Sequence, residues 1–195
     1  DATDNGGSVS AYGIDPKSGK LNGLNHRPSY GDGPCYISID KTGQYAFVSN
    51  YNRGNLVVLP LFDDGLIGNP SDAKKYVGSS VDEKRQESPH IHSAVISPDN
   101  RFLYVSDLGT DKIYIYDFNV ENGRLASSNT SEVAVNPGSG PRHFTFHPSG
   151  KFAYLAEELT STVCAFSVNK ITGELTILED TIKSLPAGFA APNTS

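Results

Sequence analysis

Residues 140–166, GPRHFTFHPSGKFAYLAEELTSTVCAF, decide the fold, because the chain contains their pattern three times. GPCYISIDKTGQYAFVSNYNRGNLVVL occupies residues 33–59, and HIHSAVISPDNRFLYVSDLGTDKIYIY occupies residues 90–116. The three copies align without a gap, and their first residues are 57 and 50 positions apart. A period near 50 residues with several short strands per unit is typical of a β-propeller or a similar radial array.

Each copy contains three short segments in which apolar and polar residues alternate, as a β-strand requires. In residues 140–166, Phe144 and Phe146 fall on one strand face, while His143 and Thr145 fall on the other. A turn with glycine or asparagine at its last position separates the first two segments, and a weaker fourth strand follows the turn at 170–173. We therefore expect an all-β fold, a propeller built from four-stranded antiparallel blades.

The blade count indicates about half of a seven-bladed ring, in one segment that spans residues 1–195. Its expected parts are a half blade at 1–32, three blades at 33–87, 88–139 and 140–182, and a loop toward a missing blade at 183–195. Template matching gives roughly fourteen strands. A half ring leaves two open sides, so we expect a longer chain or a further component to complete it.

Charge and cysteine content narrow the functional class. The net charge of −6 argues against a nucleic-acid-binding protein, and no apolar run is long enough to span a membrane. Cys35 and Cys164 occupy non-equivalent repeat positions, so we expect no disulfide between them. Two isolated thiols fit a reducing compartment and predict a cytoplasmic protein, with secretion left open because the N-terminus looks truncated. The sequence gives no oligomeric state.

The longest segment outside the repeat runs from residue 63 to residue 87. It contains a strand-like pair, Tyr76-Val77, and then the polar run SSVDEKRQE. About 25 residues is long for a connection in a compact domain, and such segments often cover functional sites. Two interpretations stay open, a solvated connection and a wall of the pocket.

The repeat alignment places Cys35, His92 and Arg142 at one equivalent position. The first strand of each propeller blade lines the central channel, so these three side chains should stand side by side at its rim. Histidine can exchange a proton near neutral pH. Arginine binds carboxylate or phosphate through two hydrogen bonds. The pair suits an anionic, oxygen-rich ligand.

A second set of candidates lies where the second strands end. Glu158 is a candidate general acid or base near Arg142, and Glu157 should face the opposite way because successive strand residues alternate. Further substrate contacts are expected on the same rim, from His90, Asn50, Tyr51, Asp107 and His143.

Structural roles remain as alternatives for each candidate. Arg142 could tie neighbouring blades together, His92 could be a satisfied polar residue, and Glu158 could belong to a solvated loop. His90 and His92 could share a metal ion, but no third ligand is evident. We therefore predict neither a metal nor a cofactor.

The motifs GPCYISIDKTGQYAFVSNY, SPHIHSAVISPDNRFLYVSDL and GPRHFTFHPSGKFAYLAEEL resemble the lactonase family of seven-bladed β-propellers. That family includes bacterial 6-phosphogluconolactonases and fungal carboxymuconate lactonizing enzymes. The resemblance implies site roles for His92 in P-H-x-H-S, for Arg142 in G-P-R-H, and for Glu158 in N-E-L, where Glu157 replaces the usual asparagine. It also implies a further arginine in the part of the family that this chain lacks.

Three functions follow as hypotheses. The first is hydrolysis of a phosphorylated sugar lactone, like that of a 6-phosphogluconolactonase, and the sequence P-H-I-H-S favours it. The second is a cyclase of 3-carboxymuconate type, which adds a carboxylate across a double bond. The third is a propeller that binds a partner without catalysis. The first two both require cations for a small anionic lactone or carboxylate, and fold alone does not choose among the three.

Overall fold

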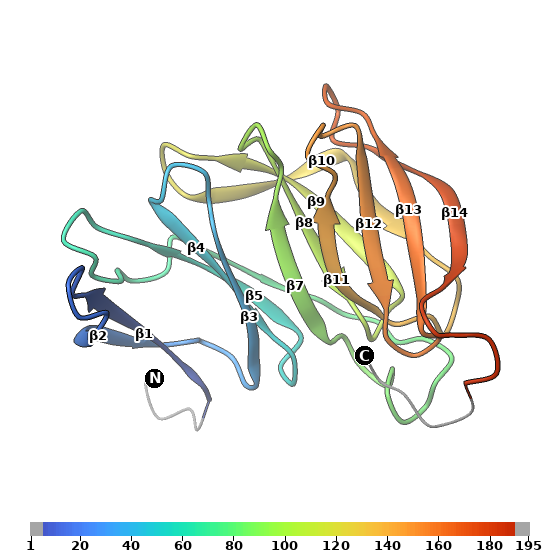
Figure 1. The fold of residues 1–195 in the computed structure, drawn as a ribbon, viewed down its shortest axis with the longest axis horizontal. Coiled ribbons are helices and arrows are strands. Elements are labelled where there is room, and N and C mark those ends of the chain that lie inside the picture. The colour runs from blue at the N-terminus through green and yellow to red at the C-terminus, as the bar shows by residue number, and fades with distance from the viewer. Residues whose placement is uncertain (1–5, 190–195) are drawn as a thin grey trace.

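A computed structural model describes residues 6–189, which form fourteen β-strands in four antiparallel sheets and, within that range, no helix (Figure 1). A two-stranded sheet pairs β1 (Ser8–Ile14) with β2 (Leu21–Pro28). The first four-stranded sheet contains β3 (Pro34–Ile39), β4 (Tyr45–Asn50), β5 (Asn55–Pro60) and β6 (Asp72–Lys75). The second contains β7 (Ile91–Ile96), β8 (Phe102–Asp107), β9 (Lys112–Asn119) and β10 (Arg124–Ala134). The third contains β11 (Pro141–Phe146), β12 (Phe152–Glu157), β13 (Thr162–Val168) and β14 (Leu175–Lys183).

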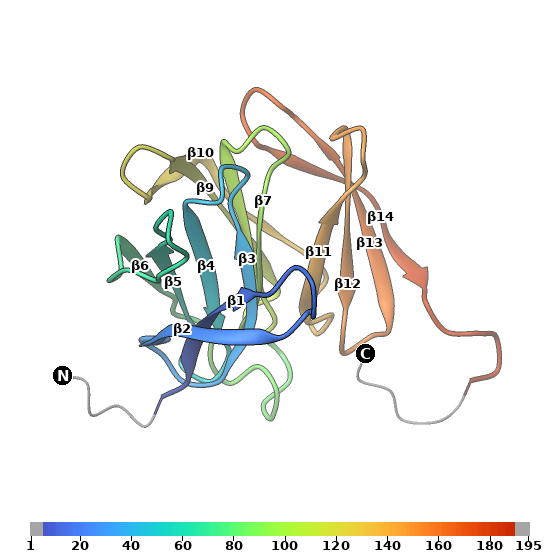
Figure 2. The ribbon, with the colours of Figure 1, turned by 60° about the vertical axis from the view of Figure 1, so that its left-hand side comes forward.

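Every four-stranded sheet is a meander, in which each strand pairs with the next one along the chain. The sheets are arranged like blades around the strands that begin them, since β7 contacts both β3 and β11 (Figures 1 and 2). This arrangement confirms the prediction of propeller blades with four antiparallel strands. We call the three sheets, with their connections, the first (33–87), second (88–139) and third (140–182) blades. Of the predicted terminal loop at 183–195, residues 190–195 lie outside the described part of the chain.

One strand differs from the prediction. The fourth strand of the first blade is β6, and it ends at Lys75, before the strand-like pair Tyr76-Val77. The reason is that Lys75 pairs with Asn55, where β5 begins, so the ladder has no further partner strand. Tyr76 instead packs its buried ring on Tyr114 of the second blade, with 4.5 Å between the ring centroids.

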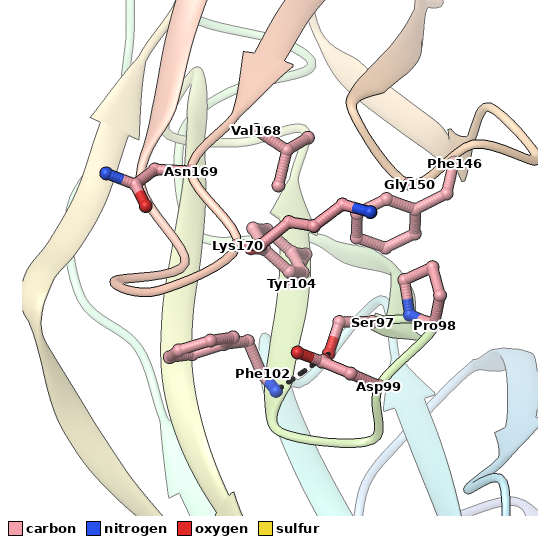
Figure 3. Close-up of a pocket in the computed structure, with 10 residues that line it drawn as sticks. All are labelled: Ser97, Pro98, Asp99, Phe102, Tyr104, Phe146, Gly150, Val168, Asn169 and Lys170. Atoms are coloured by element: carbon pink, nitrogen blue, oxygen red, sulfur yellow. Dashed lines mark hydrogen bonds between the residues drawn. The ribbon is translucent and has the colours of Figure 1, made fainter.

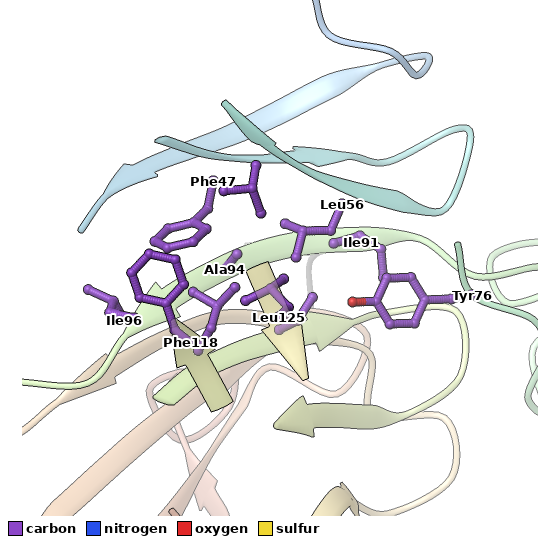
Figure 4. Close-up of a cluster of buried hydrophobic side chains, with 11 residues drawn as sticks. Phe47, Leu56, Tyr76, Ile91, Ala94, Ile96, Phe118 and Leu125 are labelled. Carbon is purple, nitrogen blue, oxygen red and sulfur yellow. The ribbon is translucent and has the colours of Figure 1, made fainter. Parts of the chain in front are cut away.

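Apolar side chains hold neighbouring blades together. Between the first and second blades, Phe47 and Phe118 meet edge to face, 5.1 Å apart, within a larger buried cluster (Figure 4). Between the second and third blades, Tyr104 stacks on Phe144 at 5.2 Å. A smaller cluster joins the first blade to β1 through Val9. Burial of apolar surface between neighbours is the main source of stability in such repeat arrays.

The two outermost sheets each expose an apolar face. Tyr12 and Ile14 of β1 are exposed at one end of the array, and Phe152 and Tyr154 of β12 are exposed at the other. These are the two open sides that the blade count predicts for a half ring.

Candidate functional site

A β-bulge lies at the same position in each of the three inner strands. The pairing register shifts between Pro34 and Tyr36, between Ile91 and Ser93, and between Pro141 and His143. The residues that the shifts skip are Cys35, His92 and Arg142, the three that the repeat alignment made equivalent. A bulge turns a side chain away from the regular alternation of a strand.

The bulge in β11 interrupts the alternation of side-chain directions that the sequence predicts for this strand. Regular alternation would put Arg142 and His143 on opposite faces of the strand. In the structure, Nη1 of Arg142 lies 3.1 Å from Nδ1 of His143, so the two successive side chains meet. His143 is exposed, while the next residue, Phe144, is buried in the blade interface.

The carboxylate of Glu158 is the centre of a charged cluster. Its Oε2 accepts a hydrogen bond from Nε of Arg142 at 2.9 Å. Its Oε1 accepts one from Nη2 of Arg85 at 2.6 Å. Nε2 of His92 lies 3.4 Å from Oε2. Glu158 is only 5% exposed, so one buried carboxylate holds two guanidinium groups and contacts an imidazole.

Arg85 enters this cluster from the polar segment between β6 and β7. The backbone N–H of Arg85 donates to Oδ1 of Asp82, which forms a turn. The fully buried side chain of Gln86 donates from Nε2 to the backbone oxygen of Leu108 at 2.8 Å. Farther back, Ser80 donates to Asp111 at 2.5 Å. These bonds fix the segment against the second blade, so its role includes a wall of the site.

Aromatic rings form the other side of the cluster. Tyr51 stacks on His90, with 4.3 Å between ring centroids, and stands edge-on to His92 at 5.5 Å. The ring of His143 is edge-on to that of His92 at 5.2 Å and tilted against Tyr36 at 5.7 Å. The phenol oxygen of Tyr51 also accepts a 3.3 Å hydrogen bond from Nη2 of Arg85.

Neighbouring charges and burial set the protonation states. Burial alone would raise the pKa of Glu158, but the hydrogen bonds from Arg85 and Arg142 outweigh it, and the pKa falls below 4.5. Burial of His92, and partial loss of solvent around the otherwise exposed ring of His143, lower the pKa of each below 6.5, and the charge of Arg142 lowers each further. At neutral pH Glu158 is therefore a carboxylate, and His92 and His143 are neutral. Glu158, Arg85 and Arg142 together carry a net positive charge.

Comparison with known proteins identifies the family of this fold and cluster. The sequence profile described as "Lactonase, 7-bladed beta-propeller" matches residues 1–195. The chain belongs to the lactonase family. The 6-phosphogluconolactonase of Bacillus subtilis is 37% identical over 186 residues, which cover 95% of this chain and 52% of the relative. That of Formosa agariphila is 34% identical, over 89% of this chain and 49% of the relative.

Solved structures agree with the family assignment. The periplasmic gluconolactonase of Pseudomonas aeruginosa superimposes with a TM-score of 0.88 at 36% identity, over 96% of this chain and 52% of that one. The chain therefore spans about half the length of the relatives it matches. Among residues 6–189, no helix is long and apolar enough to cross a membrane.

Six of the eight side chains predicted for the site come together. They are His92, Arg142, Glu158, His90, Tyr51 and His143. As expected, only one of the adjacent glutamates belongs to the cluster, because Glu157 accepts a hydrogen bond from Thr162 instead.

Of the predicted substrate contacts, Asn50 and Asp107 do not join the cluster, because each side chain is hydrogen-bonded elsewhere. The buried amide of Asn50 donates to the backbone oxygen of Ser29 at 3.0 Å. The buried carboxylate of Asp107 accepts hydrogen bonds from the backbone of His90 and from the Thr110 hydroxyl. Both side chains fasten loops at strand ends, a role that the position at a strand end could not separate from ligand binding.

Sequence reasoning missed Arg85. The residue lies outside the repeat, so no equivalent position in another copy marked it, and 73 residues separate it from Glu158. The available signal was a pair of cations, Lys84 and Arg85, in the polar run that leads into His90 and His92. Within residues 6–189, no group of three or more histidine, cysteine or acidic side chains is placed to hold a metal ion.

A separate hollow lies at the other end of the sheets, between the second and third blades (Figure 3). Phe102, Tyr104 and Phe146 line it together with residues of three turns, and Ser97 Oγ there accepts a hydrogen bond from the backbone N–H of Phe102. The hollow lies where the inner strands β7 and β11 end, whereas the charged cluster lies where they begin. The two are therefore at opposite rims of the blades.

Proposed function

We propose that the protein to which this chain belongs hydrolyses the ester bond of a phosphorylated sugar lactone. The observation that carries this proposal is the cluster of Arg85, Arg142 and Glu158, with a net positive charge, where three inner strands begin. An anionic substrate and an anionic transition state both gain from such a site. The names of the B. subtilis and F. agariphila relatives support the choice of substrate class.

Lactone hydrolysis needs a stabilised oxyanion and a path for one proton. Water adds to the lactone carbonyl carbon, the carbonyl oxygen becomes negative, and the ring C–O bond then breaks. The proton that the attacking water loses returns to the departing ring oxygen. Arg142 suits the oxyanion, because its guanidinium is fixed through Nε and partly exposed.

The water-activating base should have a lone pair that faces the open side of the cluster. Both oxygens of Glu158 are engaged by arginines. In His92, Nε2 faces the carboxylate, which only accepts hydrogen bonds, so the lone pair falls on Nδ1. That Nδ1 is buried and has no hydrogen-bond partner among the described residues. The exposed ring of His143 is the candidate that remains. Nη1 of Arg142, which can only donate, meets its Nδ1 at 3.1 Å, so His143 acts as the base once the substrate oxyanion takes over that donor. Glu158 and His92 then become its positioning partners.

The reaction would take place without a resident cofactor. The two free thiols, Cys35 and Cys164, fit the reducing compartment predicted from sequence, so we place the protein in the cytoplasm. Partial desolvation raises the pKa of Cys35 to about 11, so this thiol at the rim is protonated at neutral pH.

Hydrolysis of freshly prepared 6-phosphogluconolactone by the full-length protein tests the proposal. The spontaneous opening of the lactone is subtracted, and the variants Arg142→Ala and Glu158→Ala are assayed beside the wild type. We expect fast turnover that each substitution lowers by more than about a hundredfold, the scale of a lost oxyanion or acid–base group. Turnover no faster than in buffer would contradict the proposal, and muconates would be the next substrates to assay.

A further inference from the structure

The segment between β6 and β7 adds a second arginine to the charged cluster. In a chain built from repeats, this segment is the one long departure from the period, and it places a single cation, Arg85, beside Glu158. Glu158 already has one guanidinium partner in Arg142. One carboxylate is neutralised by one arginine, so the group of Glu158, Arg142 and Arg85 has one positive charge in surplus; the exposed carboxylate of Glu87 lies 3.3 Å from Nε2 of His90 instead.

The surplus charge is accessible. The side chain of Arg85 is 37% exposed and that of Arg142 is 29% exposed, whereas Glu158 between them is 7% exposed. Of the guanidinium nitrogens of Arg85, only Nη2 makes a hydrogen bond to the described residues, to Glu158 and to Tyr51. Nε and Nη1 therefore keep donors for a ligand.

The backbone that presents Arg85 is rigid. Its N–H is bound to Asp82, and the next residue, Gln86, is buried and bound to Leu108 and Asp82. A guanidinium on a fixed turn loses little freedom when it binds an anion, and its flat fork of donors matches the oxygens of a phosphate group.

We propose that Arg85 is a specificity-determining residue of the lactonase site, which binds the phosphate group of the substrate through the donors that Glu158 leaves free. The inference rests on the proposed function for its substrate class. Arg142 then acts at the carbonyl and Arg85 at the phosphate, and Glu158 fixes the two guanidinium groups relative to each other.

The alternative is that Arg85 only supports Glu158. The two interpretations differ in what the loss of Arg85 does to a substrate that has no phosphate. A purely supporting role would affect phosphorylated and unphosphorylated gluconolactone alike, mainly through kcat. Phosphate binding would affect the phosphorylated substrate alone, mainly through KM.

The test uses the full-length protein and its Arg85→Met variant, with Lys84→Met as the matched control. Lys84 is exposed in the same turn, so this control removes one positive charge from the same segment without touching Glu158. For Arg85→Met we expect KM for 6-phosphogluconolactone to rise roughly 10- to 100-fold, the range for one lost hydrogen bond between charged groups. KM for unphosphorylated gluconolactone should change less than about threefold. Arg85→Lys should retain part of the affinity, because it keeps the charge but loses the fork.

The proposal would be overturned if Arg85→Met lowered kcat/KM equally for both lactones, or lowered it for neither. Binding of inorganic phosphate, measured by calorimetry, separates this inference from the proposed function. If the wild type opens neither lactone but binds phosphate in a way that Arg85→Met abolishes and Lys84→Met does not, the function fails and the anion site stands. If Arg85→Met leaves phosphate binding intact, the assignment of Arg85 is wrong. Thermal unfolding of each variant confirms that it is folded.

Discussion

Arg85 and Glu158 form a 2.6 Å ion pair between groups that are 73 residues apart in the sequence. Arg85 precedes the second blade, and Glu158 follows the second strand of the third. The same carboxylate binds Arg142, the residue in the bulge of β11. The contact therefore joins two blades, and it makes the positions of both guanidinium groups depend on the charge of one buried side chain.

Replacement of Glu158 by glutamine should lower both stability and activity. The amide has nearly the shape of the carboxylate but cannot balance two guanidinium groups, and one of its ends would present hydrogens to an arginine. We expect a loss of about 1.5–3 kcal/mol in the free energy of unfolding, the range for hydrogen bonds to a charged group. Denaturant titration of the full-length protein measures it. A variant as stable as the wild type would show that the ion pairs of Glu158 with the two arginines do not contribute to the free energy of unfolding.

The same pair predicts a pH dependence. The pKa of Glu158 is lowered on folding, so its contribution to stability is present above the unfolded value, near 4.5, and is lost as pH falls through the lower folded pKa. The difference in unfolding free energy between the wild type and Glu158→Gln should therefore be largest at neutral pH and shrink below about pH 4.5. A difference that stays constant from pH 7 to pH 3 would contradict the lowered pKa.

Substitution of Arg142 should lower kcat/KM much more than substitution of an exposed arginine outside the cluster. Arg142→Lys keeps the charge, but a single ammonium cannot hold Glu158 and an oxyanion in the fixed directions of a guanidinium. We expect kcat/KM to fall more than about tenfold for Arg142→Lys and more than about a hundredfold for Arg142→Ala. Arg124→Ala, on the outer strand β10, is the matched control and should leave the kinetics unchanged. Full activity in Arg142→Lys would mean that charge alone suffices.

The repeat in the sequence identifies Arg142 as a site candidate but does not identify Arg85. The repeat made Arg142 equivalent to His92 and Cys35, because propeller blades repeat one local structure, and the structure brings all three to adjacent inner strands. Arg85 has no counterpart in another copy. Its position results from tertiary bonds of the segment, such as that of Gln86 to Leu108, and no local pattern encodes these.

The bulges and the loop-fastening residues show a second limit. Strand alternation correctly buried Phe144 and exposed Thr145, but it could not locate the extra residue at Arg142 that brings His143 to the same side. Likewise, Asn50 and Tyr51 are neighbours at one strand end, yet only Tyr51 joins the cluster. Whether such a polar residue binds its own loop or a ligand depends on the backbone groups nearby, which sequence position does not reveal.

His143 should control the acidic side of the pH–rate profile. Its pKa is lowered below 6.5, by partial loss of solvent first and by Arg142 next, so the ring is neutral and able to accept a proton at pH 7. We expect kcat/KM of the wild type to fall as pH drops through that pKa, and His143→Gln to lower kcat/KM at pH 7 by about a hundredfold or more. His26→Gln, an exposed histidine on β2, is the control. A loss below about threefold with an unchanged acidic limb would return the base role to Glu158 or His92.

The packing between blades predicts a stability effect far from the charged cluster. The buried hydroxyl of Tyr104 in the second blade donates a 2.6 Å hydrogen bond to the backbone oxygen of Gly173 in the third. Tyr104→Phe keeps the ring stacked on Phe144 but leaves that carbonyl without its donor. We expect a loss of about 1–3 kcal/mol, the cost of an unsatisfied buried polar group.

Tyr154→Phe is the matched control for this substitution, because Tyr154 is 36% exposed on the open face of β12. Its hydroxyl makes no hydrogen bond to the described residues, so its removal should change the free energy of unfolding by less than about 0.5 kcal/mol. Equal effects of the two substitutions would mean that the bond between Tyr104 and Gly173 does not contribute to the adhesion of the blades. Unchanged lactone kinetics in Tyr104→Phe would show that the interface at this rim and the site at the other can be altered independently, as expected for positions at opposite ends of the same strands.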